Sequence, residues 1–306
     1  MIALLAGTGA LPGLLAKRLQ QTGEVPLICE MAGFPPEVPD DLPRLRFRIE
    51  TLGSCLATLR RMGVTRLCLA GAVRRPSVDP AAIDAAAAPL VPRLQAALTK
   101  GDDGTLRGIM AILEEEGFTI LAAQDIAPDL LPPPGILTRA KPSPEHRGDA
   151  PLAERQLAAM GRADLGQTCV LRAGVVVAQE DDAGTDALLA RLAQPSRDAD
   201  NSSDPVSWLM DTASDMLGDA ADWLSNVAPE GPASGGMLFK GPKPGQDRRA
   251  DLPVIGPETA RGAIRAGLAG IVIEAGGVMV LHLQEVLTLL DNAGLFLWVR
   301  AAGDDA

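Results

Sequence analysis

The feature that most constrains the fold of this chain is an alternation of short apolar runs with helical patterns, which begins at the first residue. The strand-like runs are IALLAG, VPLICE, VTRLCLAGAV and FTILAAQDI, and the helical patterns are LPGLLAKRLQQTG, CLATLRRMG and GTLRGIMAILEEEG. Strands that alternate with helices are typical of a parallel sheet with right-handed crossovers. The first part of the chain is therefore predicted to be an α/β domain.

Two proline-rich stretches interrupt this alternation. The run LLPPPG is followed by RAKPSPEHRGD, which is rich in proline and charge and is predicted to be a loop. We place the domain boundary in this region, with a first domain at 1–133, a linker at 134–150 and a second domain at 151–306. A chain of 306 residues with 47% hydrophobic side chains can bury two cores of this size.

The second domain is predicted to be α/β as well. The run TCVLRAGVVVAQE predicts a β-hairpin that turns at Ala173-Gly174, and a helix is predicted to begin near Thr185. The end of the chain, through LFLWVR, follows a helix–strand–strand–helix–strand order.

A strongly acidic segment lies within the second domain, at residues 195–233. It holds eight acidic side chains and one basic side chain, so seven of the eleven net negative charges lie there. Its run DPVSWLMDTASDMLGDAADWLSNV predicts one amphipathic helix. Because an anionic membrane would repel the acidic face, we predict an insertion that docks on its own domain or on a partner subunit.

The composition limits where the protein works and what it binds. The four cysteines lie in apolar runs without CxxC spacing, which predicts buried thiols in a cytosolic protein. The N-terminus does not resemble a signal peptide, and no run of about 18 apolar residues occurs, so neither export nor membrane spanning is expected. A net charge of -11 without a Lys/Arg-rich run argues against a nucleic-acid partner.

A glycine-rich turn, GTGALPG at residues 7–13, connects the first strand to its helix. Such a turn can bring backbone N–H groups to a phosphate, and Glu30 ends the second strand, where a ribose-binding acid often lies. However, Pro12 occupies the place of the third glycine of GxGxxG, so the dinucleotide fingerprint is broken. A phosphate contact and a simple tight turn both stay open, and an NAD(P)-dependent oxidoreductase is the alternative function.

Two acidic motifs are candidates for a magnesium or phosphate site. In KGDDGTLRG, Asp102 and Asp103 follow Lys100 at a helix start, where they either cap the helix or bind a hard cation. In QEDDAGTD, Glu180 ends a strand, and its oxygen-rich surroundings suit magnesium, although capping by Thr185 explains part of the pattern. The chain has only two histidines, far apart in sequence and without HxH or HxxxH spacing, which argues against a histidine-built dimetal site.

A further motif, GPKPGQDRRADLPVIG, occupies residues 241–256. It places one lysine, two prolines and an arginine pair before Asp251, and Lys240 directly precedes the motif. Lys240, Lys243, Arg248 and Arg249 can supply positive charge to an anionic ligand. Taken alone, the motif also fits a surface loop that enters a strand.

Together these motifs resemble a known family. GTGALP, KGDDGTLRG, AKPSPEH, DLGQTCVL, EDDAGTDALL, the long run from KGPKPGQDRRADLPVIG to GGVMVL, and GLFLWV occur in this order over nearly the whole chain. The combination closely resembles the UDP-2,3-diacylglucosamine pyrophosphatases of lipid A biosynthesis in some Gram-negative bacteria, the LpxI type. The acidic segment 195–233 is not part of the family pattern.

The resemblance implies a magnesium-dependent hydrolase that cleaves the phosphoanhydride of UDP-2,3-diacylglucosamine to UMP and 2,3-diacylglucosamine 1-phosphate. It also implies an N-terminal Rossmann-like domain and a C-terminal α/β domain with the glycolipid between them. The cytoplasm, with peripheral contact to the inner membrane, is the expected location, and a homodimer is left open. The run PLVPRLQAALTKGDD is one candidate for lining the acyl chains. A nucleotide- or lipid-binding protein without turnover is a further alternative.

The site residues expected on this basis fall into three groups. The catalytic residues are Asp251, Asp102, Asp103 and Lys243; the substrate-binding residues are Gly9, Ala10, Lys100, Gln167, Gly184, Thr185, Asp186, Lys240 and Arg249; the magnesium ligands are Asp251 and Glu180. Asp251 matches the family's essential aspartate and could hold magnesium or orient the attacking water. Cleavage of a diphosphate concentrates negative charge on the oxygens around phosphorus and on the departing phosphate, which explains the need for nearby cations.

Overall fold

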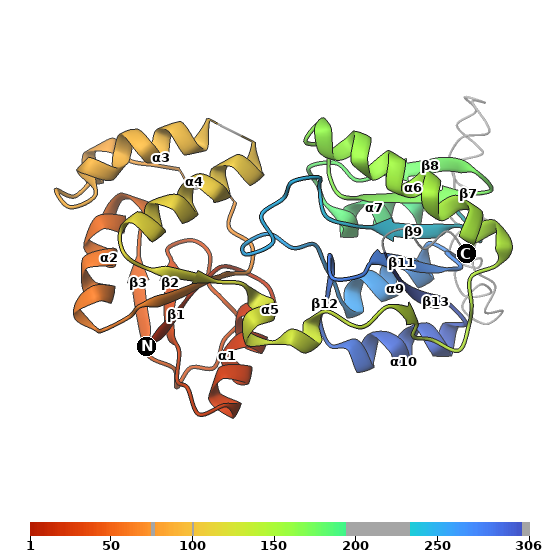
Figure 1. The fold of residues 1–306 in the computed structure, drawn as a ribbon, viewed down its shortest axis with the longest axis horizontal. Coiled ribbons are helices and arrows are strands. Elements are labelled where there is room, and N and C mark those ends of the chain that lie inside the picture. The colour runs from red at the N-terminus through yellow and green to blue at the C-terminus, as the bar shows by residue number, and fades with distance from the viewer. Residues whose placement is uncertain (75–76, 100, 194–232, 302–306) are drawn as a thin grey trace, which may run out of the picture. The chain divides into compact units, whose positions relative to one another are not determined.

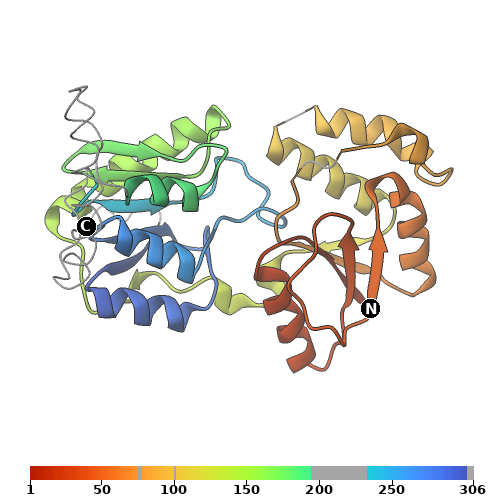
Figure 2. The same ribbon diagram turned by 180° about the vertical axis from the view of Figure 1, so that it is seen from behind.

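The structure is a computed structural model that describes residues 1–74, 77–99, 101–193 and 233–301 (Figure 1; Figure 2 shows the opposite side). The chain forms two compact units. The first comprises Met1–Leu131 and Gly245–Leu252, and the second comprises Pro132–Pro244 and Pro253–Ala306. The amphipathic helix predicted within the acidic segment lies outside the described residues.

The first unit is built on a five-stranded parallel sheet in the order β3-β2-β1-β4-β5. The strands are β1 (Ile2–Ala6), β2 (Leu27–Met31), β3 (Arg44–Phe47), β4 (Arg66–Ala70) and β5 (Thr119–Leu121). The helices are α1 (Leu11–Gln21), α2 (Leu52–Arg61), α3 (Val91–Leu98), α4 (Asp102–Glu115) and α5 (Ala123–Ile126), with short 3-10 turns at Ile49–Thr51, Pro80–Ala82, Ala88–Leu90 and Pro128–Leu130. The strand order reverses between β1 and β4, as in Rossmann-like sheets, and the predicted parallel α/β fold is confirmed.

Two elements of the first unit differ from the prediction. Strand β3 has the sequence RLRF, which lacks an apolar run, and it pairs with β2 at the edge of the sheet. The run FTILAAQDI is a strand only as far as Leu121. Asp125 Oδ2 then accepts a hydrogen bond from the backbone N–H of Ala122 (2.9 Å), which caps α5 and ends the extended conformation.

Helix α3, the candidate for lining acyl chains, contributes to the core of the first unit. Its Leu94 is buried in the same cluster as the β-strand residues, together with Leu90 just before the helix. Ala97 packs against Gly108 of α4 so closely that a Cβ on Gly108 would lie 2.5 Å from the Ala97 Cβ. These apolar side chains are therefore used for packing between helices.

The second unit is built on a six-stranded mixed sheet in the order β6-β13-β11-β9-β7-β8. The strands are β6 (Gly135–Ile136), β7 (Thr168–Arg172), β8 (Val175–Gln179), β9 (Met237–Lys240), β11 (Gly270–Glu274) and β13 (Phe296–Arg300), and a separate pair joins β10 (Val254–Ile255) to β12 (Met279–Val280). The helices are α6 (Pro144–Arg162), α7 (Thr185–Leu192), α9 (Pro257–Arg265) and α10 (Leu283–Ala293). Strands β9, β11 and β13 are parallel, so their carboxyl ends share one edge.

The predicted order of elements in this unit is confirmed in three places. Strands β7 and β8 form an antiparallel hairpin, with positive φ angles at Ala173 (51°) and Gly174 (79°) in its turn. Helix α7 begins at Thr185, and α9, β11, β12, α10 and β13 follow in the expected order. One prediction is wrong. In the supposed loop RAKPSPEHRGD, Ser143 Oγ accepts the backbone N–H of His146 (3.3 Å) and caps α6, with a proline at its first position.

The two faces of the second sheet carry separate cores. Val170 and Leu238 pack with residues of α7, α9 and α10, whereas Leu171 and Phe239 pack with residues of α6. This division follows from the alternation of side chains along each strand. Within the described part of the chain, no helix combines the length and apolar character that crossing a membrane requires.

All four cysteines are free and buried, as predicted. Burial raises the pKa of Cys169 to about 12, whereas a thiol in the unfolded chain has an ordinary pKa of 9.0. Between these values the folded state binds more protons than the unfolded state, so the free energy of unfolding falls as the pH rises above about 9. Cys169→Ala is expected to reduce this fall by about 1.4 kcal/mol per pH unit.

Urea unfolding of both proteins at about pH 8, 9 and 10 measures the two slopes. The chain contains no tyrosine, so phenol ionisation does not complicate the comparison. Equal slopes in the variant and the parent chain would contradict the prediction.

Candidate active site

The side chain of Lys240, at the carboxyl end of β9, is buried. Lys240 has 5% of its surface exposed, and its Nζ donates a hydrogen bond to Thr185 Oγ1 (2.7 Å). Burial lowers the pKa of Lys240, while the carboxylates of Glu180 and Asp186 act in the opposite direction. β9 is an interior strand, paired with β7 and β11, which fixes the backbone of this lysine in the sheet.

The Glu180 carboxylate lies within this buried cluster. It is 9% exposed, its Oε1 accepts the hydroxyl of Thr185 (2.6 Å), and its Oε2 accepts the backbone N–H of Gln167 (2.6 Å). Thr168 Oγ1 lies 3.0 Å from Thr185 Oγ1. The side-chain Oε1 of Gln167 is buried and has no hydrogen-bond partner within the described residues. A polar substrate group could satisfy it.

The start of α7 explains how the QEDDAGTD motif reaches Lys240. Gly184 precedes the helix with a φ of 87°, in the left-handed region that favours glycine, and Asp186 lies in the first turn. Asp181 serves the turn itself, because its Oδ1 accepts the backbone N–H of Ala183 (2.9 Å). The structure thus brings Glu180, Thr185 and Lys240 into one network, with the charge of Asp186 acting on it.

Lys243 follows three residues later and belongs to the second unit. Its Nζ lies 2.7 Å from Asp164 Oδ1, an ion pair just beyond the end of α6. A Cβ on Gly161 would lie 2.5 Å from Pro244 Cδ, so the chain packs directly on this helix. The proline-flanked lysine is therefore fixed against α6.

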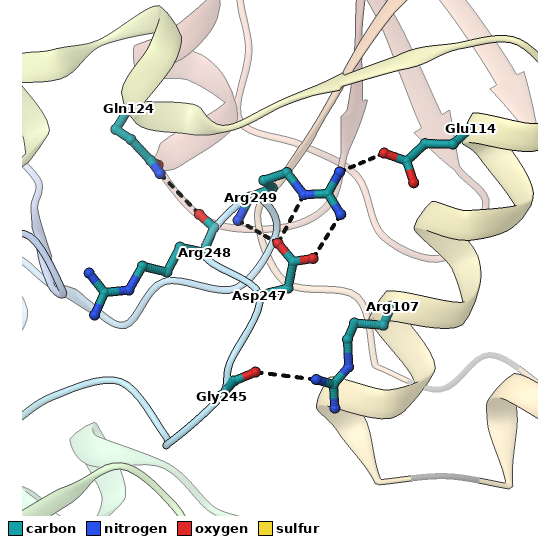
Figure 3. Close-up of polar contacts among 7 residues, drawn as sticks. All are labelled: Arg107, Glu114, Gln124, Gly245, Asp247, Arg248 and Arg249. Atoms are coloured by element: carbon teal, nitrogen blue, oxygen red, sulfur yellow. Dashed lines mark hydrogen bonds and ion pairs between the residues drawn. The ribbon is translucent and has the colours of Figure 1, made fainter.

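The next segment, Gly245–Leu252, packs with the first unit although it follows β9 of the second, and we call it the anchored loop. Arg107 of α4 donates to the backbone oxygen of Gly245 (3.2 Å), and Gln124 of α5 donates to that of Arg248 (3.0 Å) (Figure 3). Arg249 reaches Glu114 of α4 (2.5 Å, Nη1 to Oε1). These contacts fix the loop that carries Asp251.

Asp251 lies half-buried at the end of the anchored loop. Its Oδ2 accepts a hydrogen bond from Gln246 Nε2 (2.6 Å), and Gln246 is itself buried. Ala250, just before it, packs against the hydrophobic core of the first unit. The hydrogen bond from Gln246 therefore orients the carboxylate, and the packing of Ala250 holds this end of the loop against the first unit.

Helix α4, which receives the anchored loop, begins at Asp102, so the KGDDGTLRG motif forms a helix start as predicted. Lys100 and the side chains of Asp102 and Asp103 lie outside the described residues. The motif and Asp251 thus belong to one unit, and their roles in binding stay predictions.

Backbone groups of the GTGALPG turn form hydrogen bonds with other backbone groups of the first unit. The backbone N–H of Gly7 donates to Ala70 O (2.8 Å), and that of Thr8 donates to Ala72 O (2.9 Å). A Cβ on Gly7 would lie 2.4 Å from Ala72 O, so the absence of a side chain is required by packing. Gly9 and Ala10 follow at the exposed start of α1, where their predicted substrate contact stays a prediction.

Glu30, the candidate ribose-binding acid, is paired with arginines. Its two carboxylate oxygens lie 3.4 Å from nitrogen atoms of Arg44 and Arg46 on the neighbouring strand β3. A ribose hydroxyl would compete with two cations for this carboxylate. The dinucleotide interpretation therefore has no support from this position.

Magnesium would have to be held by carboxylates of the protein. Among the residues whose side chains are described, no three His, Cys, Asp or Glu side chains gather into a metal-binding group. Magnesium that is shared with substrate phosphates needs only one or two protein carboxylates, and Asp251 fits this requirement. Both oxygens of Glu180 accept hydrogen bonds from protein donors, so an ion bound there would displace them.

Sequence reasoning missed the residues that hold the anchored loop: Arg107, Glu114, Gln124, Gln246 and Asp247. All of them lie in polar helix faces or in the loop, where the sequence pattern gives no signal of a long-range contact. Arg107 and Glu114 are seven residues apart, close to two helical turns, so they share one face of α4, which is the only regularity that sequence could have offered.

Comparison with known proteins completes this description. The model of the LpxI N-terminal domain matches residues 1–130, and that of the LpxI C-terminal domain matches residues 133–298. The UDP-2,3-diacylglucosamine pyrophosphatase LpxI of Caulobacter vibrioides is 35% identical over 296 residues, which cover 97% of this chain and 96% of that protein. A solved glycinamide-RNase-transformylase T from Mycobacterium tuberculosis is 19% identical and covers 58% of this chain and 43% of its own, but the TM-score of 0.21 is too low to support an argument. With both domain models matched in order, the chain belongs to the LpxI family.

Proposed function

We propose that this protein hydrolyses UDP-2,3-diacylglucosamine to UMP and 2,3-diacylglucosamine 1-phosphate, as a magnesium-dependent pyrophosphatase of lipid A biosynthesis. The observation that carries the proposal is the 35% identity to a pyrophosphatase of this name over 97% of the chain. The oxidoreductase alternative is not favoured, because the GxGxxG pattern is broken at Pro12 and Glu30 is paired with arginines.

The arrangement of charged residues supports a hydrolytic reaction. Negative charge grows on the diphosphate oxygens as the phosphoanhydride bond breaks, and fixed cations stabilise it. Lys240 and Lys243 are candidates, because both are held by hydrogen bonds to their own unit. In open α/β sheets ligands bind beyond the carboxyl ends of the strands, where Lys240 stands. Gln167 Oε1 is a candidate to accept a hydrogen bond from the substrate.

Asp251 is the residue to which we assign the chemistry. Its carboxylate is oriented by a hydrogen bond from Gln246. In this orientation it can align the attacking water or accept a proton from it. When bound, magnesium would neutralise charge on the diphosphate oxygens, and Asp251 is the carboxylate that would hold it.

The acyl chains of the proposed substrate suggest where the protein works. We propose peripheral contact with the cytoplasmic face of the inner membrane, because two hydrocarbon tails keep the substrate in the bilayer. A homodimer stays a prediction, to be decided by the mass of the protein in solution.

The decisive experiment measures UMP release from UDP-2,3-diacylglucosamine by the purified protein, with added magnesium, with EDTA, and with magnesium restored. We expect release that EDTA abolishes and magnesium restores. No release under any condition would disprove the proposed function. Full release in EDTA would leave the hydrolase proposal intact and disprove the magnesium requirement.

A further inference from the structure

The guanidinium of Arg249 is enclosed by two carboxylates. Its Nε and Nη2 donate to the two oxygens of Asp247 (3.0 and 2.8 Å), and its Nη1 donates to Glu114 Oε1 (2.5 Å) (Figure 3). The backbone N–H of Arg249 also donates to Asp247 Oδ1 (3.0 Å). Each nitrogen of the guanidinium group thus has an acceptor in the first unit.

The charge of Arg249 is balanced inside the protein. Its guanidinium faces the carboxylates of Asp247 and Glu114, and Arg107 also acts on the Asp247 carboxylate, so an anionic ligand would have to compete with two carboxylates for Arg249. The bidentate pair with Asp247 holds the pKa of that carboxyl below its usual range. Both carboxylates hold the pKa of Arg249 above its ordinary value. The positive charge of Arg249 is therefore used inside the protein.

The position of these contacts in the chain shows what they can control. Arg249 lies two residues before Asp251, and Arg107 and Gln124 hold the backbone of the same loop at Gly245 and Arg248. The loop thus has attachment points on both α4 and α5. Asp251 has its own hydrogen bond from Gln246, within the loop, so its direction depends on the path of the loop.

We infer that Arg249 is a positioning residue, which fixes the anchored loop to α4 through Glu114 and thereby orients Asp251, and that it does not bind substrate. This inference rests on the proposed function for its kinetic consequence. Its structural part, the attachment of the loop, is independent of substrate. Arg249 and Glu114 are both about two-fifths exposed, so their ion pair contributes little to global stability, and its loss should be felt locally.

Three variants test the inference by steady-state kinetics. Glu114→Gln is expected to lower kcat about threefold to fivefold, the range of one partly exposed ion pair, with KM unchanged. Arg249→Ala is expected to lower kcat more, by at least about tenfold, because the bidentate pair is lost too. Glu114→Gln in the Arg249→Ala background is expected to have no further effect, because both act through one contact.

Glu115→Gln is the matched control. It removes the same charge from the same helix, but Glu115 pairs with Arg93 of α3 (2.8 Å). Hydrogen–deuterium exchange of residues 245–252 provides the second readout: we expect faster exchange in Glu114→Gln and Arg249→Ala, and parent rates in Glu115→Gln.

Two results would overturn the inference. A rise in KM of Arg249→Ala with unchanged kcat would assign this residue to substrate binding, and parent exchange rates in Glu114→Gln would show that the pair does not hold the loop. If the parent protein releases no UMP, the proposed function fails, and the exchange rates still decide whether the loop is attached through this pair.

Discussion

Asp251→Ala is expected to lower the turnover of UDP-2,3-diacylglucosamine by at least about a hundredfold, the loss typical of a general base. The carboxylate acts mainly in the transition state, where it aligns the water or holds the ion beside the diphosphate. Substrate binding should largely persist, because the acyl chains and the uridine supply most of the affinity, and removing an anion beside a diphosphate relieves repulsion. Single-turnover kinetics and retention of labelled substrate measure the two effects.

Gln246→Met is the control for this variant. It removes the hydrogen bond to Asp251 Oδ2 but keeps the carboxylate, so it separates the orientation of the group from its presence. We expect turnover to fall much less in Gln246→Met than in Asp251→Ala. Near-normal turnover of Asp251→Ala would contradict the mechanistic assignment and leave the family membership intact.

The same measurement decides the role of the adjacent carboxylates at the start of α4. Asp102→Ala and Asp103→Ala should each lower turnover as much as Asp251→Ala if they share the ion. A small effect would indicate that they only stabilise the helix start.

Glu180→Gln is expected to lower the free energy of unfolding by about 3 kcal/mol, because it removes the carboxylate that acts most strongly on the buried Lys240 ammonium. Lys240 has almost no contact with solvent, and Glu180 is one of two carboxylates that oppose the loss of its proton. The amide also offers only one acceptor oxygen, whereas both oxygens of Glu180 accept hydrogen bonds.

Lys240→Met in the same background should recover part of this loss, because the neutral pair no longer contains an uncompensated charge. The two substitutions are expected to be non-additive by about 2 kcal/mol in urea unfolding. Asp182→Asn, at an exposed position two residues beyond Glu180, is the control and should change stability by less than about 0.5 kcal/mol. Additive effects would contradict the description of Lys240, Thr185 and Glu180 as one network.

Most elements of the fold were predictable because their side chains follow a local period. The parallel strands β1, β2 and β4 are buried apolar runs, and the turn of the β7–β8 hairpin is marked by Ala173-Gly174. The errors occurred where a local signal had two meanings. The prolines on either side of Ser143 suggested a loop, but Pro144 is the first residue of α6, and the charged sequence RLRF gave no sign of the edge strand β3.

The sequence by itself determined the α/β class, the order of the hairpin and of the closing elements, and the motifs that place Lys240, Thr185 and Asp251 among the candidates. The class and the order of elements depend on neighbours in the chain or on periodicity, both of which are visible in one dimension. The three residues became candidates through motifs that resemble a known family. Only the tertiary structure decided how the candidates are used. Lys240 and Thr185 are 55 residues apart and Arg249 and Glu114 are 135 apart, and a hydrogen bond between distant polar side chains leaves no periodic trace. Arg249 therefore looks the same in sequence whether it binds a phosphate or attaches a loop, and only the carboxylates packed around it distinguish the two.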